Sequence, residues 1–181
     1  MMIRYVLLSV LGMVAVAAAI HPTEPNICEA AKNGNMEAVK WFLENGSNVN
    51  DVCDHGYTAL HWAANGAHNE IVQMLLTKGA EVNAVNDDGF APIHNAAMGG
   101  DSMTVRMLVD HGAFLYLMDN NQMTPLCLSA LRDNFAAAKA LIAAGADVNF
   151  VNENKWTPMR VAQYKKNYEF AEMLKAHGAK E

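Results

Sequence analysis

Hydrophobic and polar positions repeat along the chain with a period of 33 residues. The clearest markers are five glycines at this spacing: Gly46, Gly79, Gly112, Gly145 and Gly178. In each period, a short segment with small apolar residues precedes a longer one whose apolar residues, such as Ile71 and Leu75, have helical spacing. This pattern predicts stacked pairs of helices, in which each unit buries its apolar face against its neighbours.

Helix boundaries can also be assigned from residue type. Threonines suited to the N-cap position are Thr58, Thr124 and Thr157, and prolines suited to the first helical turn are Pro92, Pro125 and Pro158. The periodic glycine should end the second helix, because only glycine adopts the left-handed conformation without a steric penalty. In two units the turn glycine is replaced by Gln122 or Lys155, and there we expect Asn121 or Asn154 to take the positive φ angle.

The segments T-A-L-H-W-A-A at 58–64 and G-A-D-V-N at 145–149 resemble the repeat of the ankyrin family. The resemblance covers 25–181 and implies an all-α fold, an ankyrin-repeat α-solenoid of five helix-turn-helix repeats with β-hairpin fingers. The implied units are about 25–53, 54–86, 87–119, 120–152 and 153–181, with the first and last acting as caps. The resemblance also implies that His61 and His94 bond the threonine position locally, a role that Cys28, Cys127 and Arg160 cannot fill in the same way.

The first 19 residues have the pattern of a secretory signal peptide. Arg4 is followed by an apolar run that ends in small residues at 17–19, and 20–24 form a short linker. A membrane anchor is the competing interpretation, although the apolar stretch is short for a span of about 20 residues. We therefore predict an exported protein, periplasmic or secreted, with no membrane association after cleavage.

The acidic charge narrows the range of partners. The formal net charge is −6, and loss of Arg4 with the signal peptide leaves −7. An acidic surface does not attract phosphate backbones, so nucleic acid and anionic membranes are poor candidates. The seven histidines do not form a metal-ligand pattern, and no catalytic or nucleotide motif is present. We expect no enzyme activity, no catalytic residue, no metal and no cofactor.

The three cysteines are too few for a disulfide-scaffolded small domain. Cys28 and Cys127 share a repeat position three units apart, too distant for a bond. Cys53 lies in a loop and could reach only Cys28. We interpret all three as buried or partly buried free thiols, with their redox state open.

A column of large apolar residues marks the predicted fingers, one before each cap position: Tyr57, Phe90, Met123 and Trp156. Such residues are enriched at interface cores, and the resemblance implies that partners lie on the finger tips and the concave helix face. The further candidates for partner binding are His55, Asp88, Trp62, Met98, Leu131, Arg132 and Tyr164. The alternative is that the column stacks finger against finger and stiffens the array.

The combined features predict an exported protein–protein interaction module, monomeric when free, that inhibits or protects against a co-exported enzyme such as a cell-wall hydrolase. The acidic rim of the fingers suits a basic partner. Two alternatives remain open. One is a secreted effector that binds a host protein, and the other is a periplasmic redox-protective protein that uses its methionines and Cys53.

Overall fold

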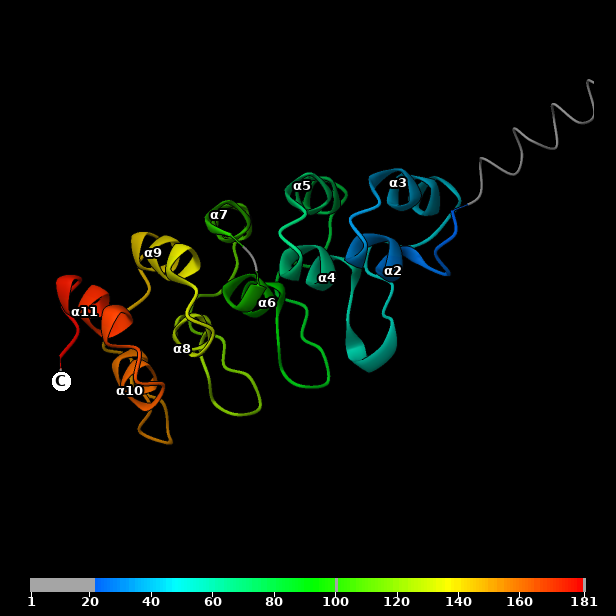
Figure 1. Ribbon diagram of the computed structural model, residues 1–181. Helices are drawn as coiled ribbons and strands as arrows, with labels where there is room; N and C mark the ends of the chain where they lie inside the picture. Colours follow the sequence, from blue (N-terminus) through cyan, green and yellow to red (C-terminus); the bar gives the residue numbers. More distant parts are fainter. Residues whose placement is uncertain (1–21, 100, 181) are drawn as a thin grey trace, which may run out of the picture.

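The computed structural model describes residues 22–99 and 101–180, so the predicted signal peptide lies outside the described residues. Within these ranges the α-helices form five successive pairs. They are α2 (Ile27–Lys32) with α3 (Met36–Glu44), α4 (Ala59–Asn65) with α5 (Asn69–Thr77), α6 (Pro92–Gly99) with α7 (Ser102–Asp110), α8 (Pro125–Leu131) with α9 (Phe135–Ala143), and α10 (Pro158–Tyr164) with α11 (Tyr168–Ala176). Figure 1 shows the pairs side by side in one elongated array.

The helices form two layers. The first helices of the pairs pack on one another in chain order from α2 to α10, and the second helices form the other layer. Alanines such as Ala63 and Ala97 are completely buried between the helices, where small side chains allow close approach. The predicted all-α solenoid is confirmed. No helix of the described ranges is long and apolar enough to cross a membrane.

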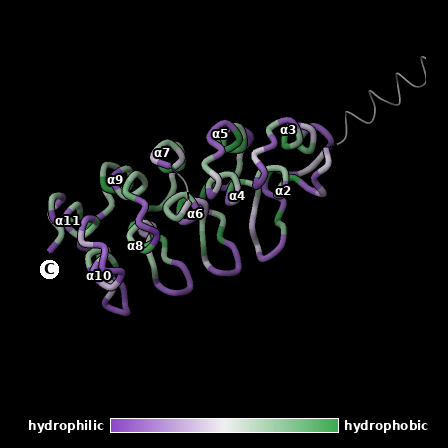
Figure 2. Tube along the Cα trace, viewed as in Figure 1, coloured by the Kyte–Doolittle hydropathy of each residue, from purple (hydrophilic) through white to green (hydrophobic). Residues whose placement is uncertain are grey.

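The loops between pairs project from one side of the array, and Figure 2 shows that their tips are largely hydrophilic. The β-hairpin fingers implied by the resemblance are not found in the described part of the chain. Its only β pairing is an isolated antiparallel bridge between Val52 and Thr58. Each loop is closed by a backbone hydrogen bond, such as the Asn86 N–H to the Phe90 carbonyl at 3.0 Å. We call these loops fingers below.

The expected helix ends are found. Thr124 and Thr157 cap α8 and α10 by accepting from the backbone N–H three residues on, and α6, α8 and α10 begin at proline. The five periodic glycines have φ between +85° and +98°. The expectation for the turns without glycine is wrong, because Gln122 and Lys155 themselves have positive φ, 64° and 62°.

A ladder of side-chain hydrogen bonds joins the units at the base of the loops. Asn83 donates to the Gly112 carbonyl at 2.9 Å and accepts from the Phe114 N–H at 2.9 Å. Asn50 and Asn149 make the same pair of contacts in their units. Where the third unit has Tyr116 instead, its hydroxyl donates to the Gly145 carbonyl at 2.9 Å and accepts from a backbone N–H. One tyrosine hydroxyl thus replaces both functions of the amide.

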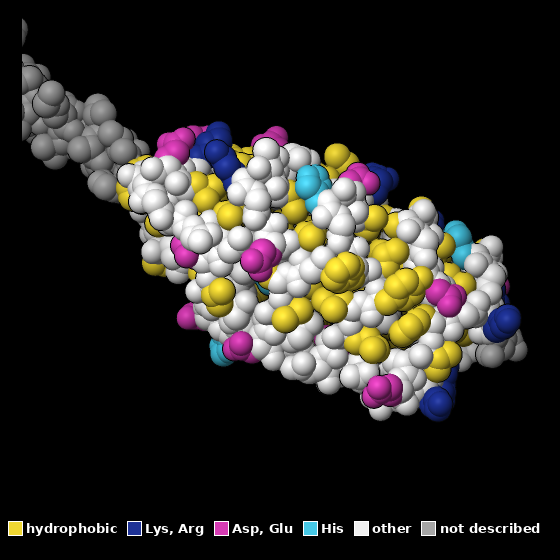
Figure 3. Space-filling view, turned by 180° about the vertical axis from the view of Figure 1, so that it is seen from behind, with side chains coloured by type: hydrophobic (Ala, Val, Ile, Leu, Met, Phe, Trp, Pro, Cys, Tyr) yellow, Lys and Arg dark blue, Asp and Glu magenta, His cyan; other side chains and the backbone are white. Residues whose placement is uncertain are grey.

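Two aromatic side chains lie on the surface at this part of the ladder. Phe114 and Tyr116 are 60% and 45% exposed, and the Tyr116 ring lies 5.4 Å from that of Phe150. Figure 3, seen from behind, shows that hydrophobic side chains also gather on that side of the array, in the half toward the C-terminus.

Candidate partner-binding surface

The finger tips are joined to one another by backbone hydrogen bonds. The Asp87 N–H donates to the His55 carbonyl and the Asn120 N–H donates to the Asp88 carbonyl, both at 3.0 Å. His55 has a positive φ of 58° at the first tip, within the short 3₁₀ turn η1 (Asp54–Gly56). The tips of the first three fingers therefore form one continuous edge, and the exposed His55 and Asp88 lie on it.

A hollow of about 600 Å³ lies where this edge meets α2 and α4, near the start of the array. Its lining combines charged, aromatic and sulfur-containing side chains: Asn26, Cys28, Glu29, Lys32, Cys53, Asp54, His55, Tyr57, Trp62 and Asp88. Four of the predicted partner-binding residues, from two fingers and one helix, are among them. The hollow therefore brings together residues that lie far apart in the sequence, from Asn26 to Asp88.

The wall of the hollow is aromatic. The rings of Tyr57 and Trp62 stack with their centroids 4.5 Å apart and their planes at 21°. Lys32 Nζ lies 4.8 Å from the Trp62 ring centroid and 3.2 Å from Glu29 Oε1. An ammonium group over an indole face is attracted by the ring quadrupole, so this wall already stabilises a cation.

The interpretation of Cys28 and Cys53 as free thiols is wrong. The two residues form a disulfide, with their Cα atoms 6.5 Å apart, which joins α2 to the first finger and lines the hollow. Cys127 is three units away from Cys28, as expected, whereas Cys28 and Cys53 lie at the two ends of the same unit, 25–53, where they meet. Cys127 is a free, buried cysteine, and burial raises the pKa of its thiol.

The disulfide replaces a contact that histidine makes in the next two units. His61 Nδ1 accepts from the Thr58 N–H at 3.1 Å, so Nε2 carries the proton and donates to the Phe90 carbonyl of the following finger at 2.9 Å. His94 Nδ1 accepts from the Ala91 N–H, and its Nε2 donates to the Leu117 carbonyl at 2.9 Å, six residues before Met123, which is the equivalent of Phe90. Cys28 holds the equivalent position in α2. A covalent bond to Cys53 therefore holds the first finger where hydrogen bonds hold the next two.

Both histidines are kept neutral by their surroundings. Burial lowers the pKa of His61 to about 4, and burial also lowers the pKa of His94. Neither side chain is exposed. Their role is to position the fingers, and they are not available for proton transfer with a bound molecule.

The apolar finger column lies half-buried rather than standing out. Each ring of the column packs on a residue of its own unit: Tyr57 on Trp62, Phe90 on His94, and Trp156 edge-on to Tyr164 at 5.7 Å. Phe90, Met123 and Trp156 also pack against the core. The observed ring contacts thus differ from the finger-against-finger stacking considered above, and part of each side chain stays accessible.

The remaining predicted residues are spread along the concave helix layer. Met98 and Leu131 are half-buried, whereas Arg132 is exposed and Tyr164 is 73% exposed. They continue the surface away from the hollow without converging on a second one.

Sequence reasoning missed the disulfide, Glu29 and Lys32. A signal for the disulfide exists in the repeat register, because Cys28 and Cys53 are separated by 25 residues, as are His61 and Asn86. Asn86 lies at the finger position of Cys53, and its N–H shares the Phe90 carbonyl with His61. Lys32 gave no such signal, because the direction of a long side chain depends on tertiary contacts.

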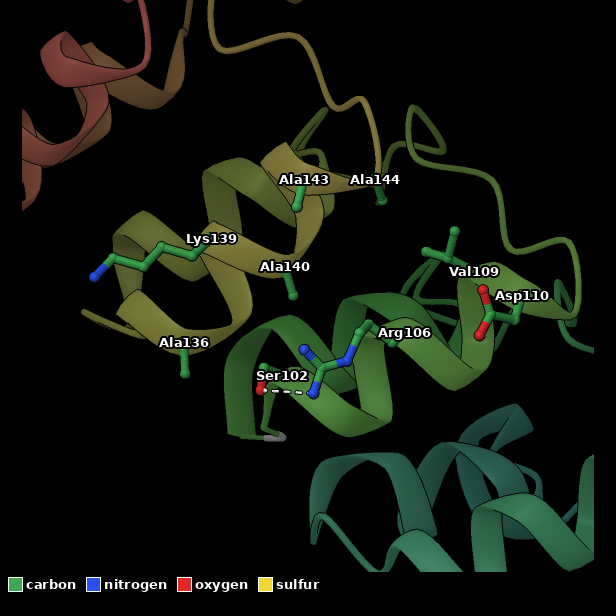
Figure 4. A pocket seen from close by; sticks show the side chains of 9 residues that line it. All are labelled: Ser102, Arg106, Val109, Asp110, Ala136, Lys139, Ala140, Ala143 and Ala144. Carbon is green, nitrogen blue, oxygen red and sulfur yellow. Dashed lines mark hydrogen bonds between the residues drawn. The ribbon is translucent and has the colours of Figure 1, made fainter.

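A second hollow, of about 510 Å³, lies between α7 and α9. Figure 4 shows Ala136 and Ala140 facing α7, Arg106 bonded back to Ser102 of its own helix, and Lys139 extending away. Small side chains leave this groove open, and its polar groups do not converge. No group of three or more His, Cys, Asp or Glu is placed to hold a metal within 22–99 and 101–180.

Stacked helix pairs with a continuous finger edge define a repeat protein that presents an extended binding surface. The family model for ankyrin repeats, described as three copies, matches residues 27–119, 69–152 and 93–181. The chain belongs to the ankyrin repeat family, and its repeats make it a protein–protein interaction module. A search of curated proteins found no match.

Proposed function

We propose that the protein is exported and binds a protein partner with its finger edge and concave helix face, inhibiting or protecting against a co-exported enzyme such as a cell-wall hydrolase. The observation that carries the binding surface is the hollow. There, finger tips, an aromatic wall and two carboxylates that have no ion-pair partner among the described residues face the same space. A protein that only binds acts by covering a surface of its partner.

Export is supported by two independent features. Residues 1–19 have the pattern of a signal peptide. The Cys28–Cys53 disulfide is the kind of bond that persists in the periplasm or outside the cell, since cytosolic thiols are kept reduced. N-terminal sequencing of the mature protein should find Ile20 first. Retention of Met1 in the exported fraction would contradict the cleavage, and a cytosolic protein with two free thiols would contradict export.

The partner can be sought directly. Tagged, oxidised protein is incubated with the exported fraction of the source organism, and captured proteins are identified by mass spectrometry. We expect one stoichiometric enzyme, whose activity falls on titration with the purified protein. Binding without loss of activity would overturn inhibition. A specific partner found only in host extract would replace this function with that of a secreted effector.

A pair of variants tests whether the apolar finger column contributes to binding. Tyr57→Ala with Trp156→Ala should weaken capture, because both side chains are half-buried on the proposed surface. Phe114→Ala is the control, since it removes an exposed aromatic ring that lies after α7 and outside the hollow. Equal capture by all three proteins would move the interface off the fingers.

A further inference from the structure

The hollow beside the disulfide has a charge imbalance that its own residues do not correct. Lys32 and Glu29 pair with each other at 3.2 Å. Asp54 and Asp88 are exposed on the rim, and neither has an ion-pair partner among the residues that the structure describes. Two uncompensated negative charges therefore face the hollow, next to the Tyr57–Trp62 wall.

The wall already holds a cation of the chain itself, so an incoming positive group takes the place of Lys32 beside the Trp62 ring. The chain's own Lys32 places its ammonium 4.8 Å from the Trp62 ring centroid. Cation–π attraction and carboxylates thus act at the same place, and together they favour a positively charged group with an apolar stem. Arginine matches this combination better than lysine, because its planar guanidinium both stacks on aromatic rings and bonds a carboxylate with two parallel N–H groups.

We propose that this hollow is an anchor site for an arginine side chain of the protein partner. The guanidinium bonds Asp54 and Asp88, and the aliphatic stem packs on Tyr57 and Trp62. The identity of the partner that supplies this arginine rests on the proposed function. The chemistry of the anchor, however, can be tested without a partner. It also gives the acidic finger edge a specific role, because the partner must present an exposed arginine within reach of the first two fingers.

The disulfide fixes the geometry that such an anchor needs. Asp54 follows directly after Cys53, so the bond to Cys28 holds one of the two carboxylates in position relative to α2. Asp88 is held through the second finger, whose tip is bonded to the first by Asp87 and His55. Preorganised groups bind a charged side chain more tightly, because less conformational entropy is lost on binding.

The experiment titrates the oxidised protein with N-acetylarginine amide and follows the Trp62 indole N–H by NMR. N-acetylcitrulline amide, which has the same shape without the charge, is the matched probe. We expect saturable shifts with the arginine compound and at least a fivefold weaker response with citrulline. The double variant Asp54→Asn, Asp88→Asn should lose about fivefold in affinity, as expected for exposed charge-assisted contacts of up to about 1 kcal/mol in total.

The control is the double variant Glu44→Gln, Asp110→Asn, which removes the same charge from exposed positions elsewhere. It should bind the arginine compound as the parent does. Equal responses to arginine and citrulline, or parental affinity in the Asp54, Asp88 variant, would overturn the anchor. If arginine binds as expected but no protein is captured from the exported fraction, the anchor stands and the proposed function fails. If a captured partner binds the variant undiminished, the anchor fails and the proposed function stands.

Discussion

Removing the Cys28–Cys53 disulfide should destabilise the protein by several kilocalories per mole. The bond closes a loop with a sequence separation of 25. In the chain-entropy model, this closure stabilises the folded state by about 3.5 kcal/mol at 25 °C. A single hydrogen bond, which is what the equivalent histidines supply, contributes only about 1 kcal/mol. The two values are far enough apart to be distinguished by experiment.

The assay is urea unfolding of the double variant Cys28→Ser, Cys53→Ser, compared with the oxidised parent. Cys127→Ala is the control for the loss of a buried thiol that forms no cross-link. Because stacked repeats contact only their neighbours, we expect the loss to appear first as opening of α2 and α3. Amide hydrogen exchange of the buried Ala30 and Val39 should accelerate, while exchange in α8 and α9 stays slow.

Two results would refute this reasoning. A stability loss of about 1 kcal/mol or less would mean that the disulfide does no more than replace a hydrogen bond. Uniform acceleration of exchange across all helix pairs would mean that the array unfolds as one unit, so that the first pair has no separate stability.

Three further predictions follow from the contacts between units. Tyr116→Phe should lower the free energy of unfolding by about 1 kcal/mol, because it removes the hydroxyl that makes both hydrogen bonds. Tyr116→Asn should not lower it, because it restores the amide that the other units have. Equal urea midpoints for Tyr116→Phe and the parent would refute the bridging role. Folded His61 stays neutral at pH values where the histidine of the unfolded chain is protonated. The free energy of unfolding should therefore fall by about 3 kcal/mol as pH drops from about 6.5 through about 4. In urea unfolding measured at several pH values, His61→Gln should show a smaller decrease. Asn152→Cys should form a disulfide with Cys127, because this pair has the same repeat positions as the native one, and mass spectrometry of the oxidised variant should show the loss of two hydrogens. Two persisting free thiols would show that the equivalence of repeat positions does not extend to this unit.

Much of the helical fold could be predicted because its determinants are local and repeated. Periodic apolar residues, proline in the first turn and glycine after the second helix each act within a few residues. Comparing units in register then reinforces every assignment. The finger edge was predicted on the same basis, and His55 and Asp88 lie on it.

The turns without glycine were mispredicted because local preference lost to the register of the array. An asparagine tolerates positive φ better than glutamine or lysine. If the positive φ angle moved one residue earlier, however, the hydrogen bonds that close the finger would be disturbed. One of these is the bond from the Lys155 N–H to the Asn152 carbonyl at 3.0 Å. Gln122 and Lys155 therefore adopt the glycine conformation themselves.

The hollow could be predicted only in part, because its chemistry depends on contacts between units. Tyr57, Trp62, His55 and Asp88 were chosen individually from the pattern, but nothing local indicates that Lys32 lies over Trp62. The disulfide could have been found by asking which positions of one unit touch, because Cys28 and Cys53 lie at the start of the first helix and in the finger of the same unit.

The position of the disulfide connects the stability of the array with its binding surface. A helix pair that packs on a neighbouring pair on one side only buries less surface and opens more readily than one between two neighbours, and among the described residues α2 and α3 pack only on the second pair. α2 and α3 are the first described pair, and their finger carries part of the hollow. A hydrogen bond that suffices between internal units would leave this finger less firmly held. The covalent bond restores its rigidity at the place where Asp54 must be held for binding. Reduction of the disulfide should therefore weaken arginine binding even under conditions in which the remaining helix pairs stay folded.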